Sequence, residues 1–281
     1  MTRIINLSEI PVLERTHARA GLFRAQALLA GLEGSPDNFF LQLSQTFSDF
    51  ASPRHRHNFD QVRVQLKSDA DFARDGVMQP GMVAYFPEGV FYGPQSISGE
   101  SLTLVLQLGG ASGAGYISEA RFQAAVTELQ ELGRFENGIF KTTKSDGKPK
   151  NQDAYEAVWE HVNQCALAYP ESSAKAPVFL DPQKFSWVNE PGVAGVQRKL
   201  LGDYSDRPIS MSILAIEAGT TVSIAAHAIA FVLNGSGLCN TKFWQDHTTF
   251  QTSHVPANIT AHIKAQVLEI VIPPLMSDAP L

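Results

Sequence analysis

Short stretches in which apolar and polar residues alternate dominate the first hundred residues. Three of them, at 39–43, 62–66 and 102–106, follow the two-residue period of a strand with one buried face. Glycine and proline separate these stretches at short intervals. Many short strands with regular turn signals indicate a β-sandwich or β-barrel between about residues 21 and 108.

The apolar period changes in the middle of the chain. From Ser118 to Leu132 the apolar residues recur at helical spacing, and Gly133 follows as a stop signal. Residues 141–153 are polar and contain Gly and Pro, which predicts an exposed loop. A second helical pattern runs from Ala154 up to Tyr169 and Pro170. We expect the two helices to bridge two β domains.

The β pattern returns after Phe185. Apolar runs at 211–216, 231–233 and 267–272 each lead into a turn. The order β-rich, helical, β-rich suggests an internal duplication. The predicted fold class is therefore mainly β, with an N-terminal barrel at 1–117, a helical linker region at 118–175 and a C-terminal barrel at 176–281.

Composition narrows the class of protein. The 281 residues are 44% apolar and 18% charged, as in an ordinary globular protein, and the length suits two small barrels. The net charge of −6 argues against a nucleic-acid partner. No apolar run approaches the roughly 20 residues of a membrane span, and the charged N-terminus does not resemble a signal peptide. Two distant cysteines predict neither a disulfide framework nor a cysteine-based metal cluster. A cytoplasmic location is the default expectation.

The segment 53–61 contains the sharpest chemical signal. On an extended strand, residues two apart point the same way, so His55, His57 and Gln61 share one face, and Asp60 points to the other. Two neighbouring imidazoles can reach one metal ion, since histidine is the commonest neutral ligand for transition metals. The pattern predicts a metal site on His55, His57 and Gln61.

This segment resembles the first motif of the cupin superfamily, in which two histidines in an HxH pattern are followed by Glu. Pro87, Gly89 and Tyr92 resemble the second motif, which has the pattern PxGxxH. Gln61 stands where the family usually places Glu, and Tyr92 where it places the third His. The resemblance implies a jelly-roll β-barrel with a transition-metal ion, iron first, with Mn, Ni, Cu or Zn as alternatives.

Each of these residues also has a simpler interpretation. His55 and His57 would also fit a solvated strand edge, and Gln61 would also fit an amide that orients a histidine or a water. Tyr92 is the candidate catalytic residue, as a general acid or base or a donor to substrate. The alternatives for Tyr92 are coordination of the metal as phenolate and packing as a buried aromatic.

The C-terminal half resembles a second, degenerate cupin. The positions that correspond to the two histidines fall on Val222 and Ile224, and the third-ligand position falls on Ala261. His262 is one residue off register, which on a strand turns a side chain to the opposite face. We expect no metal in this half.

These features favour a metal-dependent enzyme that acts on a small organic molecule, with a dioxygenase-like oxidoreductase as the first expectation. A metal-dependent lyase or isomerase is an alternative within the superfamily. A non-catalytic binding or sensing protein is the alternative from another class, because the family's acidic ligand and third histidine are missing. The expected partner is a small-molecule substrate, with no nucleic acid and no membrane. We expect a compact pseudo-dimer and leave a true homodimer open.

Overall fold

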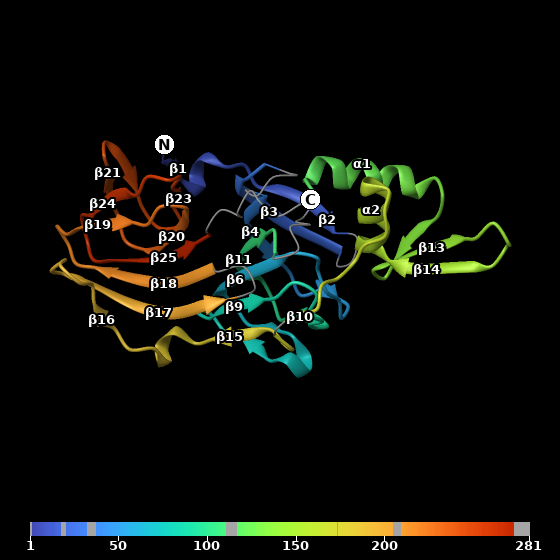
Figure 1. The fold of residues 1–281 in the computed structure, drawn as a ribbon, viewed down its shortest axis with the longest axis horizontal. Helices are drawn as coiled ribbons and strands as arrows, with labels where there is room; N and C mark the ends of the chain where they lie inside the picture. The colour runs from blue at the N-terminus through green and yellow to red at the C-terminus, as the bar shows by residue number, and fades with distance from the viewer. Residues whose placement is uncertain are drawn as a thin grey trace. The chain divides into compact units, whose positions relative to one another are not determined.

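A computed structural model gives the architecture. It describes residues 2–17, 21–32, 38–110, 117–172, 174–204 and 209–272. The fold is mainly β, as predicted (Figure 1). The chain divides into two compact units, Val12–Phe179 (the N-terminal unit) and Met1–Pro11 together with Leu180–Pro280 (the C-terminal unit). The helical region at 118–175 therefore belongs to the N-terminal unit, and the first eleven residues belong to the C-terminal unit, unlike the predicted boundaries.

The N-terminal unit is built on two antiparallel sheets. The larger has the order β15-β9-β6-β11-β4-β3-β2 and the smaller the order β5-β10-β7-β8. The strands of the larger sheet are β2 (Leu13–His17), β3 (Gly21–Ala30), β4 (Phe39–Thr46), β6 (Asp60–Lys67), β9 (Val83–Phe86), β11 (Ser101–Leu108) and β15 (Val178–Leu180). Those of the smaller are β5 (Ala51–Ser52), β7 (Ala70–Asp71), β8 (Val77–Met78) and β10 (Gln95–Ile97).

The two faces of the central strands have different surroundings. In β11, Leu104, Leu106 and Leu108 are buried, whereas Thr103 and Gln107 line a cavity. The same division holds along β4 and β6, where apolar residues are buried and the alternating polar ones face the cavity. The alternation in the sequence therefore separates a packed face from the wall of a polar cavity.

The C-terminal unit repeats this architecture without the helices. Its larger sheet has the order β1-β23-β20-β25-β18-β17-β16, and its smaller sheet the order β19-β24-β21-β22. The larger sheet contains β1 (Arg3–Ile5), β16 (Val188–Asn189), β17 (Val196–Tyr204), β18 (Ile209–Ile216), β20 (Ala228–Asn234), β23 (Thr249–Gln251) and β25 (Ala265–Val271). The smaller contains β19 (Thr221–Ile224), β21 (Gly237–Cys239), β22 (Lys242–Trp244) and β24 (Ala257–Ala261). Short 3-10 turns occupy Leu7–Glu9, Ala73–Asp75 and Pro182–Lys184.

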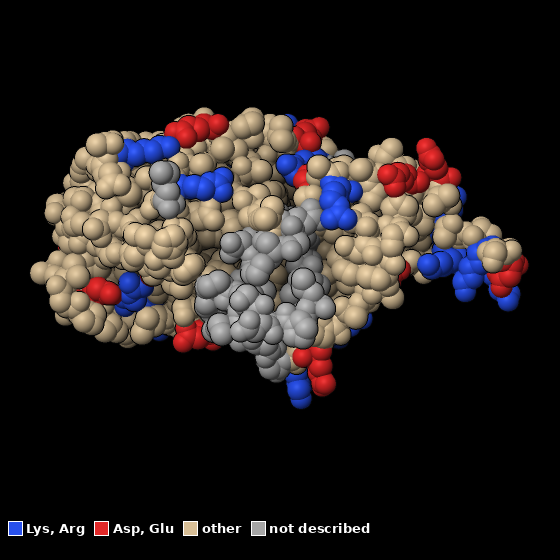
Figure 2. All heavy atoms as spheres, turned by 45° about the horizontal axis from the view of Figure 1, so that its top comes forward, with Lys and Arg blue, Asp and Glu red and all other residues tan. Residues whose placement is uncertain are grey.

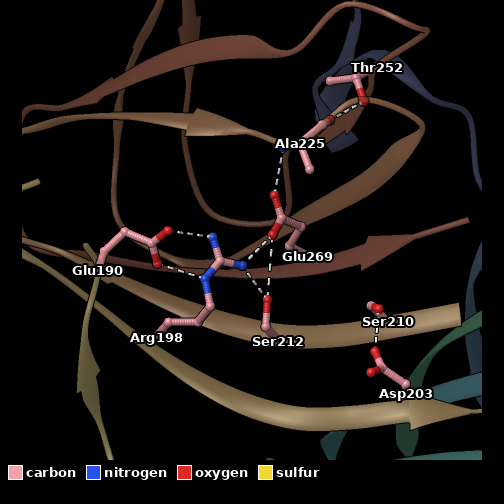
Figure 3. A network of polar contacts seen from close by, with 8 residues as sticks. All are labelled: Glu190, Arg198, Asp203, Ser210, Ser212, Ala225, Thr252 and Glu269. Carbon is pink, nitrogen blue, oxygen red and sulfur yellow. Dashed lines mark hydrogen bonds and ion pairs between the residues drawn. The ribbon is translucent and has the colours of Figure 1, made fainter. Parts of the chain in front are cut away.

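A polar network crosses the larger sheet of the C-terminal unit (Figure 3). The Arg198 guanidinium donates from Nη1 to Glu269 Oε2 at 2.5 Å and from Nε to Glu190 Oε2 at 2.8 Å. Glu269 is 2% exposed, and its Oε1 accepts the backbone N–H of Ala225 at 2.8 Å. Ser212 Oγ also accepts from Arg198 Nη1. The buried carboxylate thus has a charged partner and a backbone donor.

The middle region contains the two predicted helices, α1 (Glu119–Gln130) and α2 (Ala154–Asn163). Ser118 is the N-cap residue of α1. Helix α2 ends earlier than the pattern suggests, because Gln164 adopts a left-handed conformation with φ of 54°. The helices pack against each other around a small apolar cluster that contains Ala125, Leu129 and Val158 (Figure 1).

The predicted loop at 141–153 is wrong. It forms most of a three-stranded sheet of β12 (Arg134–Glu136), β13 (Ile139–Thr143) and β14 (Pro149–Asp153). The edge strand β14 is largely exposed, so no buried face requires its apolar and polar residues to alternate. The turn between β12 and β13 had a signal in the sequence that was missed. It is Asn137-Gly138, a pair with positive φ at both residues that favours a tight hairpin turn.

Charged side chains of both signs are interspersed on the face shown in Figure 2. The hairpin of β13 and β14 follows this pattern, since Lys141 pairs with Glu136 at 2.9 Å and Lys148 with Asp146 at 3.2 Å. No helix in the described part of the chain is long and apolar enough to cross a membrane. Cys165 is an exposed free thiol and Cys239 a buried one.

Asp153 fixes the start of α2. Its Oδ1 accepts the backbone N–H groups of Tyr155 at 2.9 Å and Glu156 at 3.0 Å. Asp153→Ala is expected to destabilise the N-terminal unit by about 1 kcal/mol, because these two donors lose their acceptor. Urea unfolding followed by Trp159 fluorescence would measure it. Asp153→Asn should retain most of the stability, and equal losses for both variants would contradict a capping role.

Candidate active site

The backbone of the two histidines is fixed by the segment that carries Tyr92. His55 and Tyr92 exchange two backbone hydrogen bonds, of 3.1 Å from the His55 N–H and 2.9 Å from the Tyr92 N–H. The carbonyl of His57 accepts the N–H of Gly89 at 2.8 Å. Both histidines precede β6 and are not on a regular strand, yet their side chains turn to the same side as predicted.

Gly89 allows the turn that brings Tyr92 into place. Its φ is +76°, and a Cβ atom there would lie 2.6 Å from the carbonyl oxygen of Pro170. Any other residue at this position would be strained and would collide with the backbone. The glycine of the predicted second motif is thus required by the local geometry.

The side chains of His55, His57, Gln61 and Tyr92 meet at one point. Tyr92 Oη lies 3.0 Å from His55 Nε2, 2.6 Å from His57 Nε2 and 3.5 Å from Gln61 Oε1. All four residues are at most 6% exposed. The structure therefore brings together every site residue predicted from the sequence.

His55 presents the lone pair of Nε2 toward this point. Its Nδ1 lies 2.6 Å from the carbonyl oxygen of Pro53, which can only accept a hydrogen bond. The proton of the neutral imidazole is therefore on Nδ1, and Nε2 is free to accept from Tyr92 or to bind a metal ion.

Arg63 is a further candidate site residue, one that was not predicted from the sequence. Its Nε donates to Gln61 Oε1 at 2.6 Å, Nη1 to Gln95 Oε1 at 2.7 Å and Nη2 to Tyr92 Oη at 3.1 Å. The guanidinium also lies 4.8 Å from the ring centre of Phe86. Burial lowers the pKa of Arg63, and the contact with Tyr92 acts in the opposite direction. A guanidinium nevertheless stays protonated in proteins, so the site contains a permanent positive charge.

Three of the four predicted residues, His55, His57 and Gln61, line a cavity of the N-terminal barrel whose described lining residues are mostly polar; Tyr92 contacts all three but is not among these lining residues. The cavity contains about 640 Å³ of empty space, including open solvent at its mouth. Arg63 is the one charged side chain among its described lining residues, which include no Asp or Glu. Neutral polar side chains from several strands complete much of the wall: Gln42, Ser44, Thr46, Ser52, Gln95, Thr103 and Gln107. An anion or a neutral polar molecule suits such a cavity better than a cation.

The donor set can be tested against a metal ion. Nowhere in the described part of the chain do three His, Cys, Asp or Glu residues gather as ligands. The two converging imidazoles fit a transition-metal ion, and Gln61 Oε1 and Tyr92 Oη add oxygen donors. The described residues that line the site include no carboxylate to offset the charges of the ion and of Arg63. A bound ion would therefore require an anionic ligand or ionised Tyr92 beside it.

The C-terminal unit has an apolar core at the corresponding positions. Val222, Ile224 and Ala261 are all buried in one hydrophobic cluster. His262 is exposed, as the one-residue offset on the strand requires. The positions that correspond to the predicted metal ligands therefore carry no donor side chains in the C-terminal unit.

Comparisons with known proteins show similarity in fold. No protein-family model matches the chain, and no curated protein matches it by sequence. One match is a solved structure from Nostoc punctiforme that is provisionally named a dioxygenase. The match covers 100% of this chain and 87% of that chain, with 10% sequence identity and a TM-score of 0.62. Streptomyces albus HEPD, solved with 2-hydroxyethylphosphonate and Fe(II) bound, matches 99% of this chain and 77% of its own, with 11% identity and a TM-score of 0.58. The match with quercetin 2,3-dioxygenase from Acinetobacter baumannii covers 98% of this chain and 86% of that chain, with 12% sequence identity and a TM-score of 0.53.

Proposed function

Because the chain has the cupin fold, we propose that its N-terminal unit is a metal-dependent enzyme, of the dioxygenase type, that acts on a small organic anion. One observation carries the proposal. The Nε2 atoms of His55 and His57 converge on Tyr92 Oη, and both histidines line a cavity in which Arg63 is the one charged side chain among the described lining residues. The names of the structurally similar proteins support the choice of reaction class.

The metal ion would be held by His55 and His57, with Gln61 as a further oxygen donor. The chemistry that iron would supply there is activation of O2 beside the substrate. The two imidazoles are held by the protein, since His55 Nδ1 is bonded to Pro53 and the ring of His57 stacks on Phe59 at 4.4 Å.

Arg63 would bind and orient the anionic group of the substrate. Its planar fork suits a carboxylate, and charge-assisted bonds of this kind are the strong ones. Tyr92 would hold a proton at Oη for transfer to or from the substrate, because Oη lies 3.1 Å from the positively charged Arg63 Nη2. The positive charge of Arg63 stabilises negative charge on Oη after the proton leaves.

Arg63→Met is expected to weaken the binding of acetate and benzoate by about 10- to 100-fold, since a charged donor pair is lost from the cavity. Arg63→Lys keeps the charge without the fork and should fall between this variant and the wild type. Isothermal titration calorimetry measures both. Arg74→Met, at an exposed site, is the control. Equal affinity of Arg63→Met and wild type for these anions would contradict the proposal that Arg63 binds an anionic substrate.

A non-catalytic protein that binds small anions is the second candidate. The observation in its favour is that Arg63 already engages Gln61 Oε1 at 2.6 Å and Tyr92 Oη at 3.1 Å, two of the four donors that a metal would use. Thermal-shift measurements separate the candidates. Stabilisation by Fe(II), Mn(II) or Zn(II) supports the enzyme, whereas stabilisation by carboxylates with no effect of any metal supports the binding protein.

A further inference from the structure

A second cavity adjoins the first, on the side of the two helices. The two share four lining residues, Phe23, Gln42, His57 and Gln107. The remaining wall of the second cavity is largely aromatic and is formed by Phe40, Phe59, Phe122 and Tyr155, with Ile117 and Glu119 beside them. We call this aromatic part the ring chamber. His57 thus lines both the polar cavity and the second cavity.

The rings of the chamber pack on one another. Phe59 and Tyr155 meet edge to face at 6.0 Å, and Phe122 and Tyr155 stack at 6.1 Å with 23° between their planes. Tyr155 Oη donates to Asn58 Oδ1 at 3.1 Å, which joins α2 to the segment that carries His57. The chamber is therefore a built wall and not an accidental gap between side chains.

The charges of the ring chamber are balanced within the protein. Glu119 is its one charged side chain among the described lining residues, and its carboxylate pairs with Arg15 at 2.9 Å. An anion gains nothing from this surface, whereas the polar cavity has the unbalanced charge of Arg63. A ligand with one anionic end and one flat apolar end would therefore bind in a single orientation.

We propose that the substrate is an organic anion with an aromatic group, the anion held by Arg63 and Gln95 and the ring held in the ring chamber. The assignment rests on the proposed function and names the substrate class of the same site. The helical region of the N-terminal unit is then the element that determines specificity, because α1 contributes Phe122 and α2 contributes Tyr155.

The test compares benzoate, acetate and benzyl alcohol as probes by calorimetry on the full chain. Benzoate is expected to bind at least about tenfold more tightly than acetate, because burial of a phenyl ring adds apolar contact. Benzyl alcohol should bind more weakly than benzoate, since it has the ring without the charge. Phe122→Ala should reduce the affinity for benzoate by about tenfold and leave acetate unchanged.

Trp159→Ala is the matched control, because Trp159 packs against the same helical cluster as Phe122 without lining the chamber. Equal binding of benzoate and acetate overturns the assignment and leaves the anion site intact. Equal losses in Phe122→Ala and Trp159→Ala also overturn it, since they would reflect the stability of the helices. If neither anion binds, the proposed function fails and the assignment fails with it.

Discussion

The variant with both His55→Ala and His57→Ala is expected to lose its transition metal. Wild-type protein, purified without a metal-chelating tag, should contain close to one ion per chain by elemental analysis. Removal of both imidazoles leaves only Gln61 and Tyr92, two weak oxygen donors that Arg63 already engages. We expect the metal affinity to fall by more than about 100-fold, since even the loss of a group that only orients a metal ligand costs about 10- to 100-fold.

The matched control replaces two histidines outside the site. His254 and His262 are both exposed in the C-terminal unit, and His254→Ala with His262→Ala should leave the metal content unchanged. Wild-type protein that contains no stoichiometric transition metal, together with an unchanged content in the double variant at 55 and 57, would refute the metal site. The non-catalytic alternative would then be preferred.

Arg198→Met is expected to destabilise the C-terminal unit by about 3–5 kcal/mol, because it leaves the carboxylate of Glu269 buried without its charged partner. Figure 3 shows how Glu190, Arg198 and Glu269 form one line of contacts. Denaturant unfolding followed by Trp187 and Trp244 fluorescence would report on this unit. Since two units need not unfold together, the transition must be analysed without assuming a single step.

Two further variants separate the burial effect from a general loss of charge. Lys264→Met breaks the exposed pair with Glu217, formed at 2.7 Å, and should cost less than about 1 kcal/mol. Arg198→Met combined with Glu269→Leu removes both buried charges and should recover much of the lost stability. A cost for Arg198→Met as small as that for Lys264→Met would show that the buried pair contributes little.

The sequence specified the barrel of the N-terminal unit and four residues of its site. The apolar and polar residues that alternate in 62–66 and 102–106 form β6 and β11, because one face of each strand is packed in the core. His55 and His57 could be found because their spacing is local. Tyr92 could be found because its distance from Gly89 follows a motif with a fixed turn.

Arg63 was missed although its position carries a signal. It stands two residues after Gln61 on the same strand, so both side chains face the same side. An arginine within an apolar run is usually assigned to solvent, and only the three-dimensional packing shows that the face it shares is the wall of a cavity. The ring chamber could not be predicted from the sequence either, because it depends on how α1 and α2 pack against the barrel.

Strand β1 can pair with β23 only after most of the chain has been synthesised. Arg3 and Gln251, joined by a side-chain hydrogen bond of 3.0 Å, are 248 residues apart in the chain. A ribosome adding 5–20 residues per second exposes β23 about 12–50 s after β1. The N-terminal unit, Val12–Phe179, is continuous and complete well before then. We therefore expect the N-terminal unit to fold before β1 can pair with β23.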